Sequence, residues 1–89
     1  MSDAPVQCWF VEREFGDRNV VTIVYATPDG SRYQQRERSS ASLRTGSPVT
    51  AAVEVPESAL EPVDDEETRT RYATEAERTA NRYAPDDPV

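Results

Sequence analysis

The sequence of 89 residues contains no lysine and no histidine, and it has only one cysteine and three glycines. Without histidine or lysine, a Ser–His–Asp triad, a Cys–His pair, a Schiff base and a histidine-ligated metal are all excluded. The glycines at positions 16, 30 and 46 are isolated, so the chain has no glycine-rich phosphate loop. These absences predict a protein that is not an enzyme and that needs no cofactor.

Cys8 is the only cysteine, so no disulfide can form within the chain. It lies inside an apolar run, where a thiol behaves as a small buried hydrophobic side chain. Long apolar runs are missing as well, since none approaches the ~18 residues that a membrane-spanning helix needs. Met1–Pro5 lacks the basic region of a signal peptide. We therefore expect a cytoplasmic protein with no membrane partner.

Acidic residues are abundant. Seventeen aspartates and glutamates stand against ten basic residues, all of them arginine, which gives a formal net charge of −7. The excess lies in the second half, where residues 45–89 carry eleven acids and four arginines, while residues 1–44 carry six of each. At molar salt the Debye length falls to about 3 Å, and a coat of hydrated carboxylates keeps such a chain soluble. The composition is therefore typical of salt-loving microbes.

Four stretches of sequence are rich in β-branched and aromatic residues or alternate in polarity, and each predicts a strand. They are residues 6–15, 20–27, 31–38 and 49–55. Turn residues at 16–19 and at Pro28–Gly30 separate the first three stretches, which predicts an antiparallel meander. The segments 39–48 and 56–63 are expected to be connectors.

A helix is predicted from Asp64 to about residue 84. Asp64 and Glu67 have the spacing of a capping box. Glu67–Arg71 and Arg71–Glu75 are spaced as ion pairs on the exposed side. A stripe at helical spacing is expected to face the sheet, and it contains Tyr72, Ala76, Thr79, Ala80 and Tyr83.

The expected fold class is α+β. An antiparallel three- to four-stranded sheet, a meander, should carry one C-terminal helix packed on one face. Residues 6–84 would form this single domain, with flexible tails at 1–5 and 85–89.

Both faces of the first two strands are apolar, whereas one helix can cover only one face. On the first strand, one face is expected to hold Val6, Cys8 and Phe10, and the other Trp9, Val11 and Phe15. The second face must be covered by the connectors or by another protein, and a large uncovered patch favours a homodimer. The candidate partner-interface residues are Trp9, Val11, Ile23 and Tyr25.

The third strand is locally basic and suggests an alternative partner. Arginines beside an aromatic residue are typical of platforms for single-stranded nucleic acid. Charge along an outer strand is, however, also the usual protection against edge-to-edge aggregation. The candidates for RNA or DNA contact are Arg32, Tyr33, Arg36 and Arg38, with Arg32, Arg36 and Arg38 on one face and Tyr33 on the other.

Three segments carry a resemblance that spans most of the chain: CWFVERE at 8–14, VYATPDG at 24–30 and RYATEAER at 71–78. With these segments the chain resembles a family of small haloarchaeal proteins of unknown function. The resemblance implies a lineage and a compartment, and it implies no activity and no site. The leading functional hypothesis is a small non-enzymatic interaction domain that binds a second copy of itself or another protein, and the alternative is an RNA- or DNA-associated accessory protein.

Overall fold

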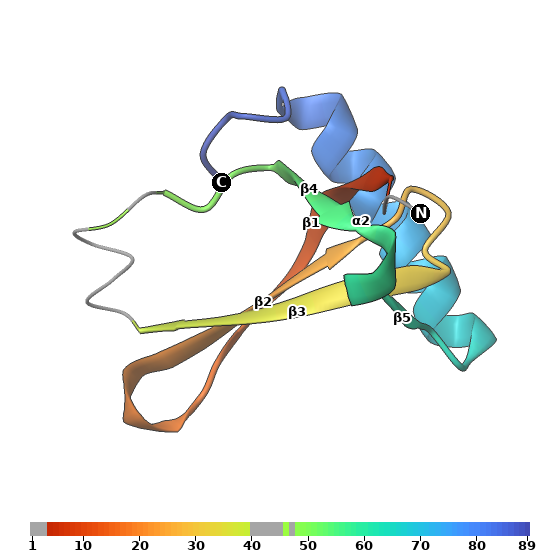
Figure 1. Ribbon diagram of the computed structural model, residues 1–89. Helices are drawn as coiled ribbons and strands as arrows, with labels where there is room; N and C mark the ends of the chain where they lie inside the picture. The colour runs from red at the N-terminus through yellow and green to blue at the C-terminus, as the bar shows by residue number, and fades with distance from the viewer. Residues whose placement is uncertain (1–3, 40–45, 47) are drawn as a thin grey trace.

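A computed structural model describes residues 4–39, 46 and 48–89. These residues form a five-stranded antiparallel sheet and one C-terminal helix (Figure 1), which confirms the α+β class. The strands follow the order β4-β1-β2-β3-β5 across the sheet. Their bounds are β1 (Pro5–Phe15), β2 (Val20–Ala26), β3 (Arg32–Ser39), β4 (Ala52–Pro56) and β5 (Glu61–Pro62). The helix α2 spans Glu66–Arg82, and two 3-10 turns are η1 (Asp17–Asn19) and η2 (Glu57–Ala59).

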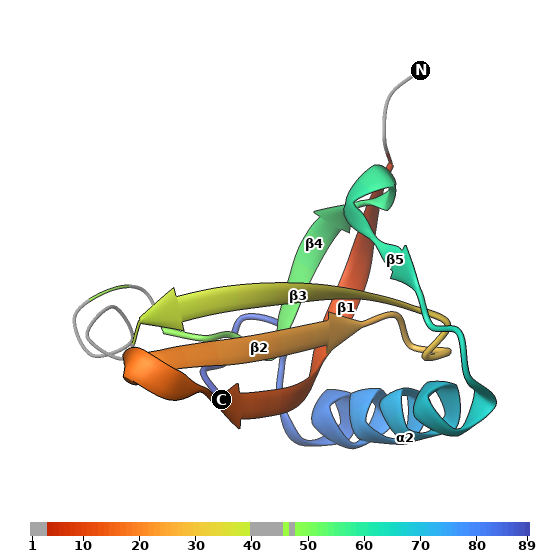
Figure 2. The same cartoon turned by 90° about the horizontal axis from the view of Figure 1, so that it is seen from below.

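The predicted meander is present as β1, β2 and β3, with the fully buried Ile23 near the middle of its central strand. The fourth strand predicted at 49–55 is present as β4, which pairs with the first half of β1. The sheet is wider than predicted because the short β5 pairs with the start of β3. Helix α2 lies across one face (Figure 2). The predicted connector 39–48 lies mostly outside the described residues, as do residues 1–3 of the predicted N-terminal tail.

A β-bulge at Val11 interrupts the pairing of β1 with β2. Phe10 lies opposite Tyr25 and Glu12 lies opposite Val24, so that Val11 is the extra residue. Because side chains alternate along a strand, one extra residue reverses every assignment that follows it. Phe15 therefore lies opposite Val21, on the face of Cys8. The predicted grouping of Phe15 with Trp9 and Val11 was wrong for this reason.

The bulge is also a point of attachment for the helix. The Thr79 hydroxyl donates a hydrogen bond of 2.7 Å to the Phe10 carbonyl. The Phe10 amide donates to the Ala51 carbonyl at 2.8 Å, on the side of β4. The backbone of one bulge residue therefore joins the helix and the segment that leads into β4.

The turn between β2 and β3 brings backbone into contact with α2. Gly30 has a φ of 72°, in the left-handed region that favours glycine. A Cβ atom at this position would overlap the Arg69 carbonyl oxygen and lie 2.7 Å from the Ala73 amide nitrogen. Gly30 thus allows both the shape of the turn and the close approach of the helix.

Asp29 stabilises the same turn through three hydrogen bonds to one of its carboxylate oxygens. The Thr27 hydroxyl donates at 2.6 Å, the Ser31 amide at 3.0 Å and the Ser31 hydroxyl at 2.7 Å. These donors favour the charged carboxylate. They lower the pKa of Asp29 from its ordinary value of 3.8 to about 2.

We expect the pH dependence of unfolding to report this carboxylate. Because the pKa of Asp29 is lower in the folded chain, its contribution is complete above 3.8 and is lost as the pH falls through about 2. Asp29→Asn keeps an acceptor oxygen and removes the charge. The thermal midpoint of the variant should lie below that of the wild type near neutral pH, and the two should converge near pH 2. A constant difference would contradict this role.

Helix α2 begins one residue later than the capping box predicts. The N-cap is Asp65, whose carboxylate accepts a hydrogen bond of 2.8 Å from the Thr68 amide. With Asp65 as the cap, the third helical position holds Thr68, so Glu67 cannot complete the reciprocal box with Asp64. The acidic run offered two adjacent caps, and spacing alone selected the wrong one.

The predicted apolar stripe is only partly buried. Tyr72, Ala76 and Thr79 are buried against the sheet, while Ala80 and Tyr83 are exposed. The helix ends at Arg82 and the backbone of Tyr83 is extended, so the helical spacing no longer places Tyr83 on the buried stripe. On the helix side of the sheet, the buried core consists of Val11, Val24, Ala26, Val63, Tyr72 and Ala76.

The ion pairs of α2 differ from those expected. Arg71 reaches Glu12 on β1 at 3.3 Å, and Arg78 pairs with Glu75 at 3.1 Å. Neither predicted pair within the helix, Glu67–Arg71 or Arg71–Glu75, is among the ion pairs of the described residues. Arg71 instead links the helix to the strand beneath it.

The face away from α2 is covered by the chain itself. Its buried residues are Cys8, Val21, Ile23, Tyr25, Val49 and Val55. Val53, Leu60 and Val89 pack against this cluster from β4, from the η2–β5 connector and from the C-terminal segment. Of the connectors considered from the sequence, 56–63 contributes Leu60 to this face, while 39–48 lies mostly outside the described residues. The C-terminal segment, which the sequence did not suggest, adds to it.

The C-terminal segment is paired along residues 49–52. The sequence predicts a flexible tail over 85–89, and the structure places these residues beside the start of β4. The Ala51 amide donates to the Asp87 carbonyl at 2.8 Å, and the Val89 amide donates to the Val49 carbonyl at 2.9 Å. These hydrogen bonds bring the half-buried Val89 onto the face away from the helix.

Candidate interaction surface

Three of the four candidate partner-interface residues lie in the core. Ile23 is 1% exposed, Tyr25 is 3% exposed and Val11 is 8% exposed. The Tyr25 hydroxyl donates a hydrogen bond of 3.0 Å to the Thr50 carbonyl. Trp9 is half-buried and lines a groove of about 590 Å³ beside small residues of α2. The structure brings Ile23 and Tyr25 together on one face and Trp9 and Val11 on the other.

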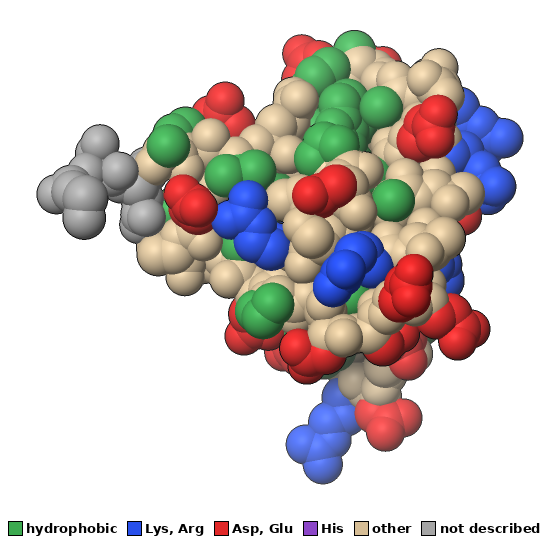
Figure 3. Space-filling view, turned by 90° about the vertical axis from the view of Figure 1, so that its right-hand side faces the viewer, with side chains coloured by type: hydrophobic (Ala, Val, Ile, Leu, Met, Phe, Trp, Pro, Cys, Tyr) green, Lys and Arg blue, Asp and Glu red, His purple; other side chains and the backbone are tan. Residues whose placement is uncertain are grey.

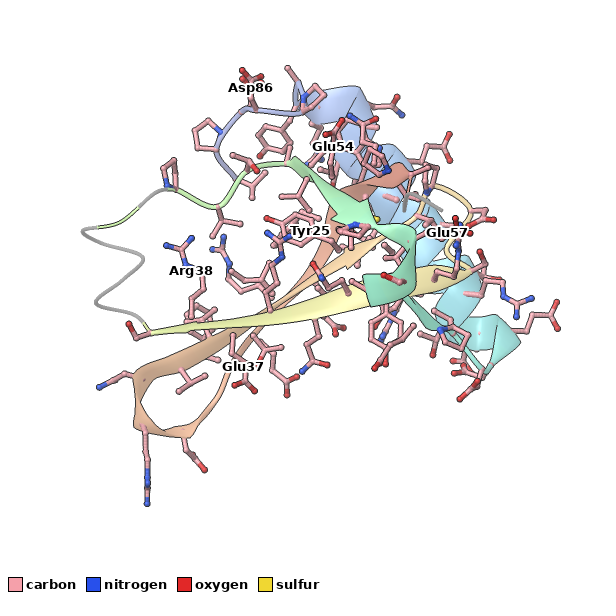
Figure 4. The ribbon with its side chains drawn as sticks, viewed as in Figure 1. Tyr25, Glu37, Arg38, Glu54, Glu57 and Asp86 are labelled. Carbon is pink, nitrogen blue, oxygen red and sulfur yellow. The ribbon has the colours of Figure 1, made fainter. Side chains whose placement is uncertain are left out.

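The arginines of β3 share one face of the strand, as predicted. Arg36 is opposite Ile23 and Arg38 is opposite Val21, so both side chains lie on the face away from α2. The Arg36 guanidinium lies 5.4 Å from the centre of the Tyr25 ring. Figure 4 shows Arg38 on this side of β3 and Glu37 on the opposite side.

The four candidate nucleic-acid residues do not form one surface. Arg32 forms an ion pair of 3.2 Å with Glu57 in η2. Tyr33 lies on the helix side, where its ring centre is 6.2 Å from that of Tyr72. The aromatic ring is therefore separated by the sheet from Arg36 and Arg38.

Among the described residues, the outer edge of β3 has a partner strand only at its first two residues. β5 pairs only with Arg32 and Tyr33. In the antiparallel register, the residues that would extend β5 past Tyr33 are Leu60 and η2, and η2 is a 3-10 turn and not an extended strand. Among the described residues, pairing along this edge therefore ends at Tyr33, and the rest of β3 extends past it (Figure 2).

The backbone groups that point out of this edge can be assigned from the hydrogen bonds. The Thr27 amide donates to the Arg32 carbonyl at 3.0 Å, so residue 32 and every second residue after it bond toward β2. The Val63 amide donates to the Ser31 carbonyl at 2.9 Å, so the odd-numbered residues point outward. Gln35 and Glu37 thus present two amides and two carbonyls that have no protein partner among the described residues.

The opposite edge of the sheet, formed by β4 and the second half of β1, is less accessible to an added strand. β4 is five residues long, ends in Pro56 and is flanked at its start by the C-terminal segment. Within the described residues, β4 pairs with β1 as far as Trp9, and the Phe10 amide continues to the Ala51 carbonyl. Farther along β1, the Arg13 side chain donates to the Val89 carbonyl at 3.3 Å. On the side that carries the start of α2, Figure 3 shows acidic and arginine side chains interspersed.

The described residues show no cluster of three or more histidine, cysteine, aspartate or glutamate side chains that could hold a metal ion. Within the same part of the chain, no helix is long and apolar enough to cross a membrane. Burial raises the pKa of the Cys8 thiol, which keeps that thiol protonated.

Taken together, the fold and its open edge define a small α+β domain that covers both faces of its own sheet. The chain belongs to a family of unknown function, DUF7967, whose model matches residues 1–89. No curated protein and no solved structure matches the chain.

The sequence does not single out Gln35 and Glu37. It shows the charged side chains of the β3 arginines, but it does not show in which direction each backbone amide points. The strand 31–38 itself was predictable, but the sequence does not show whether the strand predicted at 49–55 lies beside it. An unpaired outer strand has open backbone groups at every second residue.

Proposed function

We propose that this protein is a small non-enzymatic protein-interaction domain of a salt-loving cytoplasm, and that it binds an extended segment of its partner along the outer edge of β3. The observation that carries the proposal is the row of outward backbone groups on Gln35 and Glu37. A strand added to such an edge gains main-chain hydrogen bonds, and its side chains supply specificity.

The coverage of the sheet favours an edge over a face. Cys8 and Val55 on one face and Ala26 on the other are each fully buried within the chain. A partner could reach these residues only after α2 or the β4 side had moved away. The β3 edge, in contrast, can pair without any rearrangement of the core, and rigid binding surfaces are the common case.

The expected interaction is modest in strength. Four backbone groups are open, and each hydrogen bond contributes about 0.5–1.5 kcal/mol net of its exchange with water. Association also costs several kcal/mol of lost rigid-body freedom. Side-chain contacts beside the edge must therefore supply part of the affinity, which suits a regulated or transient partner.

The abundance of acidic residues supports a salt-rich cytoplasm, and their uneven distribution leaves the β3 edge locally basic. Of the seventeen acidic residues, eleven follow residue 45. This leaves the β3 edge, with Arg36 and Arg38, as a locally basic strip on an acidic protein. The strip sets the edge apart electrostatically from the helix side of the molecule.

A single substitution can close the edge without touching the core. Gln35→Pro removes an outward amide, and a proline on that side of an edge strand leaves the ladder to β2 intact. Gln35→Thr is the matched control, because it alters the same side chain and keeps the amide. In affinity capture at molar KCl, we expect a protein that the wild type and Gln35→Thr retain and Gln35→Pro loses.

The comparison requires that both variants fold, which equal thermal midpoints within a few degrees would establish. Equal capture by Gln35→Pro and Gln35→Thr would contradict binding at this edge. Sedimentation of the purified protein at the same salt concentration distinguishes a second copy from another protein as the bound strand.

A further inference from the structure

Building on the proposed function, we infer the chemistry of the partner: an extended segment with acidic residues at alternating positions, acid–X–acid, in which X is not acidic. The inference rests on the order of charges along β3. Arg36 and Arg38 lie on the face away from α2, and Glu37 lies between them on the other face.

Because side chains on adjacent strands face each other in pairs, the order of charges on β3 predicts which residues a partner strand should carry. Directly opposed side chains on one face have Cβ atoms about 4.5–5.5 Å apart, close enough for opposite charges to attract and for like charges to repel. A strand beside β3 places residues i and i+2 opposite Arg36 and Arg38. Carboxylates at these positions meet guanidinium groups, while residue i+1 meets the Glu37 carboxylate and must be neutral or basic.

The arginine side chains suit this contact in a salt-rich cell. A planar guanidinium pairs with a carboxylate through two parallel hydrogen bonds, and such short-range contacts persist when long-range attraction is screened. Arg36 is exposed, its guanidinium lies over the Tyr25 ring of β2, and its Nε donates a hydrogen bond of 2.7 Å to the Gln34 side chain. These contacts leave the other N–H groups of the guanidinium for a carboxylate of the partner strand.

A second copy of this chain fits the edge poorly. In a symmetric antiparallel pairing of β3 with β3, each face must match itself, so residue numbers of opposed pairs sum to an even value. One such register places Arg36 opposite Arg36, and the next places Arg36 opposite Arg38 and Glu37 opposite Glu37. Both registers oppose like charges. The register that opposes Gln35 to Gln35 would place Glu37 against Tyr33, whose outer side is already paired with β5. The edge therefore disfavours a second copy while it accepts an acidic strand.

The observations favour a peptide over a single-stranded nucleic acid. Base stacking needs an exposed aromatic ring beside the cationic groups. Tyr33 lies on the opposite face and contacts Tyr72, and the Tyr25 ring below Arg36 is 3% exposed. A phosphate backbone would find two guanidinium groups here and no ring on which to stack a base.

Two capped peptides test the inference, one of alternating glutamate and threonine and one of alternating lysine and threonine. Each is titrated into the isotopically labelled full chain in molar KCl, while the amide resonances of Gln35 and Glu37 are followed. We expect the glutamate peptide to shift both resonances. The lysine peptide should bind at least about tenfold more weakly. Arg36→Glu combined with Arg38→Glu should reverse this preference, and Gln35→Pro should abolish both interactions.

Each alternative has its own signature. Equal binding of both peptides, or a preference unchanged by the charge reversal, would overturn the acidic partner. The proposed function would still stand if Gln35→Pro lost the captured protein while the arginine variants retained it. Concentration-dependent dimers that disappear in Gln35→Pro would identify a second copy as the occupant and overturn the inference. Binding of an oligouridine that needs the arginines and is indifferent to Gln35→Pro would do the same in favour of nucleic acid.

If the doubly reversed variant fails to fold, Arg36→Gln with Arg38→Gln removes both charges and keeps polar side chains of similar length. This variant should bind the two peptides equally. Retention of the full glutamate preference would overturn the inference.

Discussion

Replacing Gly30 with alanine is expected to lower the free energy of unfolding by about 3 kcal/mol or more. Two costs combine at this position. An L-residue in the left-handed region costs about 1–2 kcal/mol, and Gly30 has a φ of 72°. The new methyl group would also overlap the Arg69 carbonyl and lie 2.7 Å from the Ala73 amide nitrogen, so the turn and α2 would have to separate.

Gly16→Ala is the matched control. The nearest atom to a Cβ at this position is the Val20 carbonyl oxygen at 3.5 Å, an ordinary contact, and the φ of Gly16 is −98°. We expect a change of no more than about 0.5 kcal/mol in that variant. Chemical denaturation at fixed KCl measures both. Similar losses in the two variants would show that close packing of the turn on α2 is not what makes Gly30 necessary.

The second large effect is expected at Ile23, which the sequence analysis considered as a contact for a partner. Ile23→Ala should lower the free energy of unfolding by about 2–5 kcal/mol, as truncation of a buried aliphatic side chain does. Its side chain is 1% exposed between Cys8, Val21 and Val55 within the single chain. The loss should not depend on protein concentration, because the cover belongs to the same molecule.

Phe15→Ala gives the comparison on the same hairpin. Phe15 is 75% exposed at the end of β1, and its truncation should change stability by about 0.5 kcal/mol or less. A stable Ile23→Ala variant that had lost an oligomer present in the wild type would show that this face is covered by another molecule.

Local patterns were sufficient to predict the meander and the helix. The apolar run of β2, the turn before Gly30 and the periodicity of α2 each depend on neighbours within one element. Spacing could not decide between Asp64 and Asp65 as the cap, since both precede the helix and both can accept a hydrogen bond from its first turn. In the structure Asp65 is the cap, and its carboxylate accepts the hydrogen bond from the Thr68 amide.

The bulge and β5 could not be predicted from these patterns. Val11 is an ordinary strand residue, and its extra position is defined only by pairing with β2 and by the hydrogen bond from Thr79 to Phe10. The two residues of β5 include a proline, which argues against a strand in any sequence rule. Both features depend on contacts between residues far apart in the chain.

The sequence predicted that both sheet faces are apolar, and it left open whether connectors or a second copy cover the second face. Leu60 and Val89 are single apolar residues in polar surroundings, so neither has a periodic pattern that points to a core. Their positions depend on where η2 and the C-terminal segment meet the sheet. The same limit applies to the candidate edge, because an open edge is defined by what fails to pair with it.

Native-state hydrogen exchange of the β3 amides tests the open edge most directly. In the purified protein at molar KCl, the amides of Gln34 and Arg36 should exchange slowly because they bond to β2. Those of Gln35 and Glu37 should exchange far faster and become slow when the captured partner is added. Equal protection at all four positions in the isolated protein would mean that the edge is already occupied, and it would contradict the proposed function.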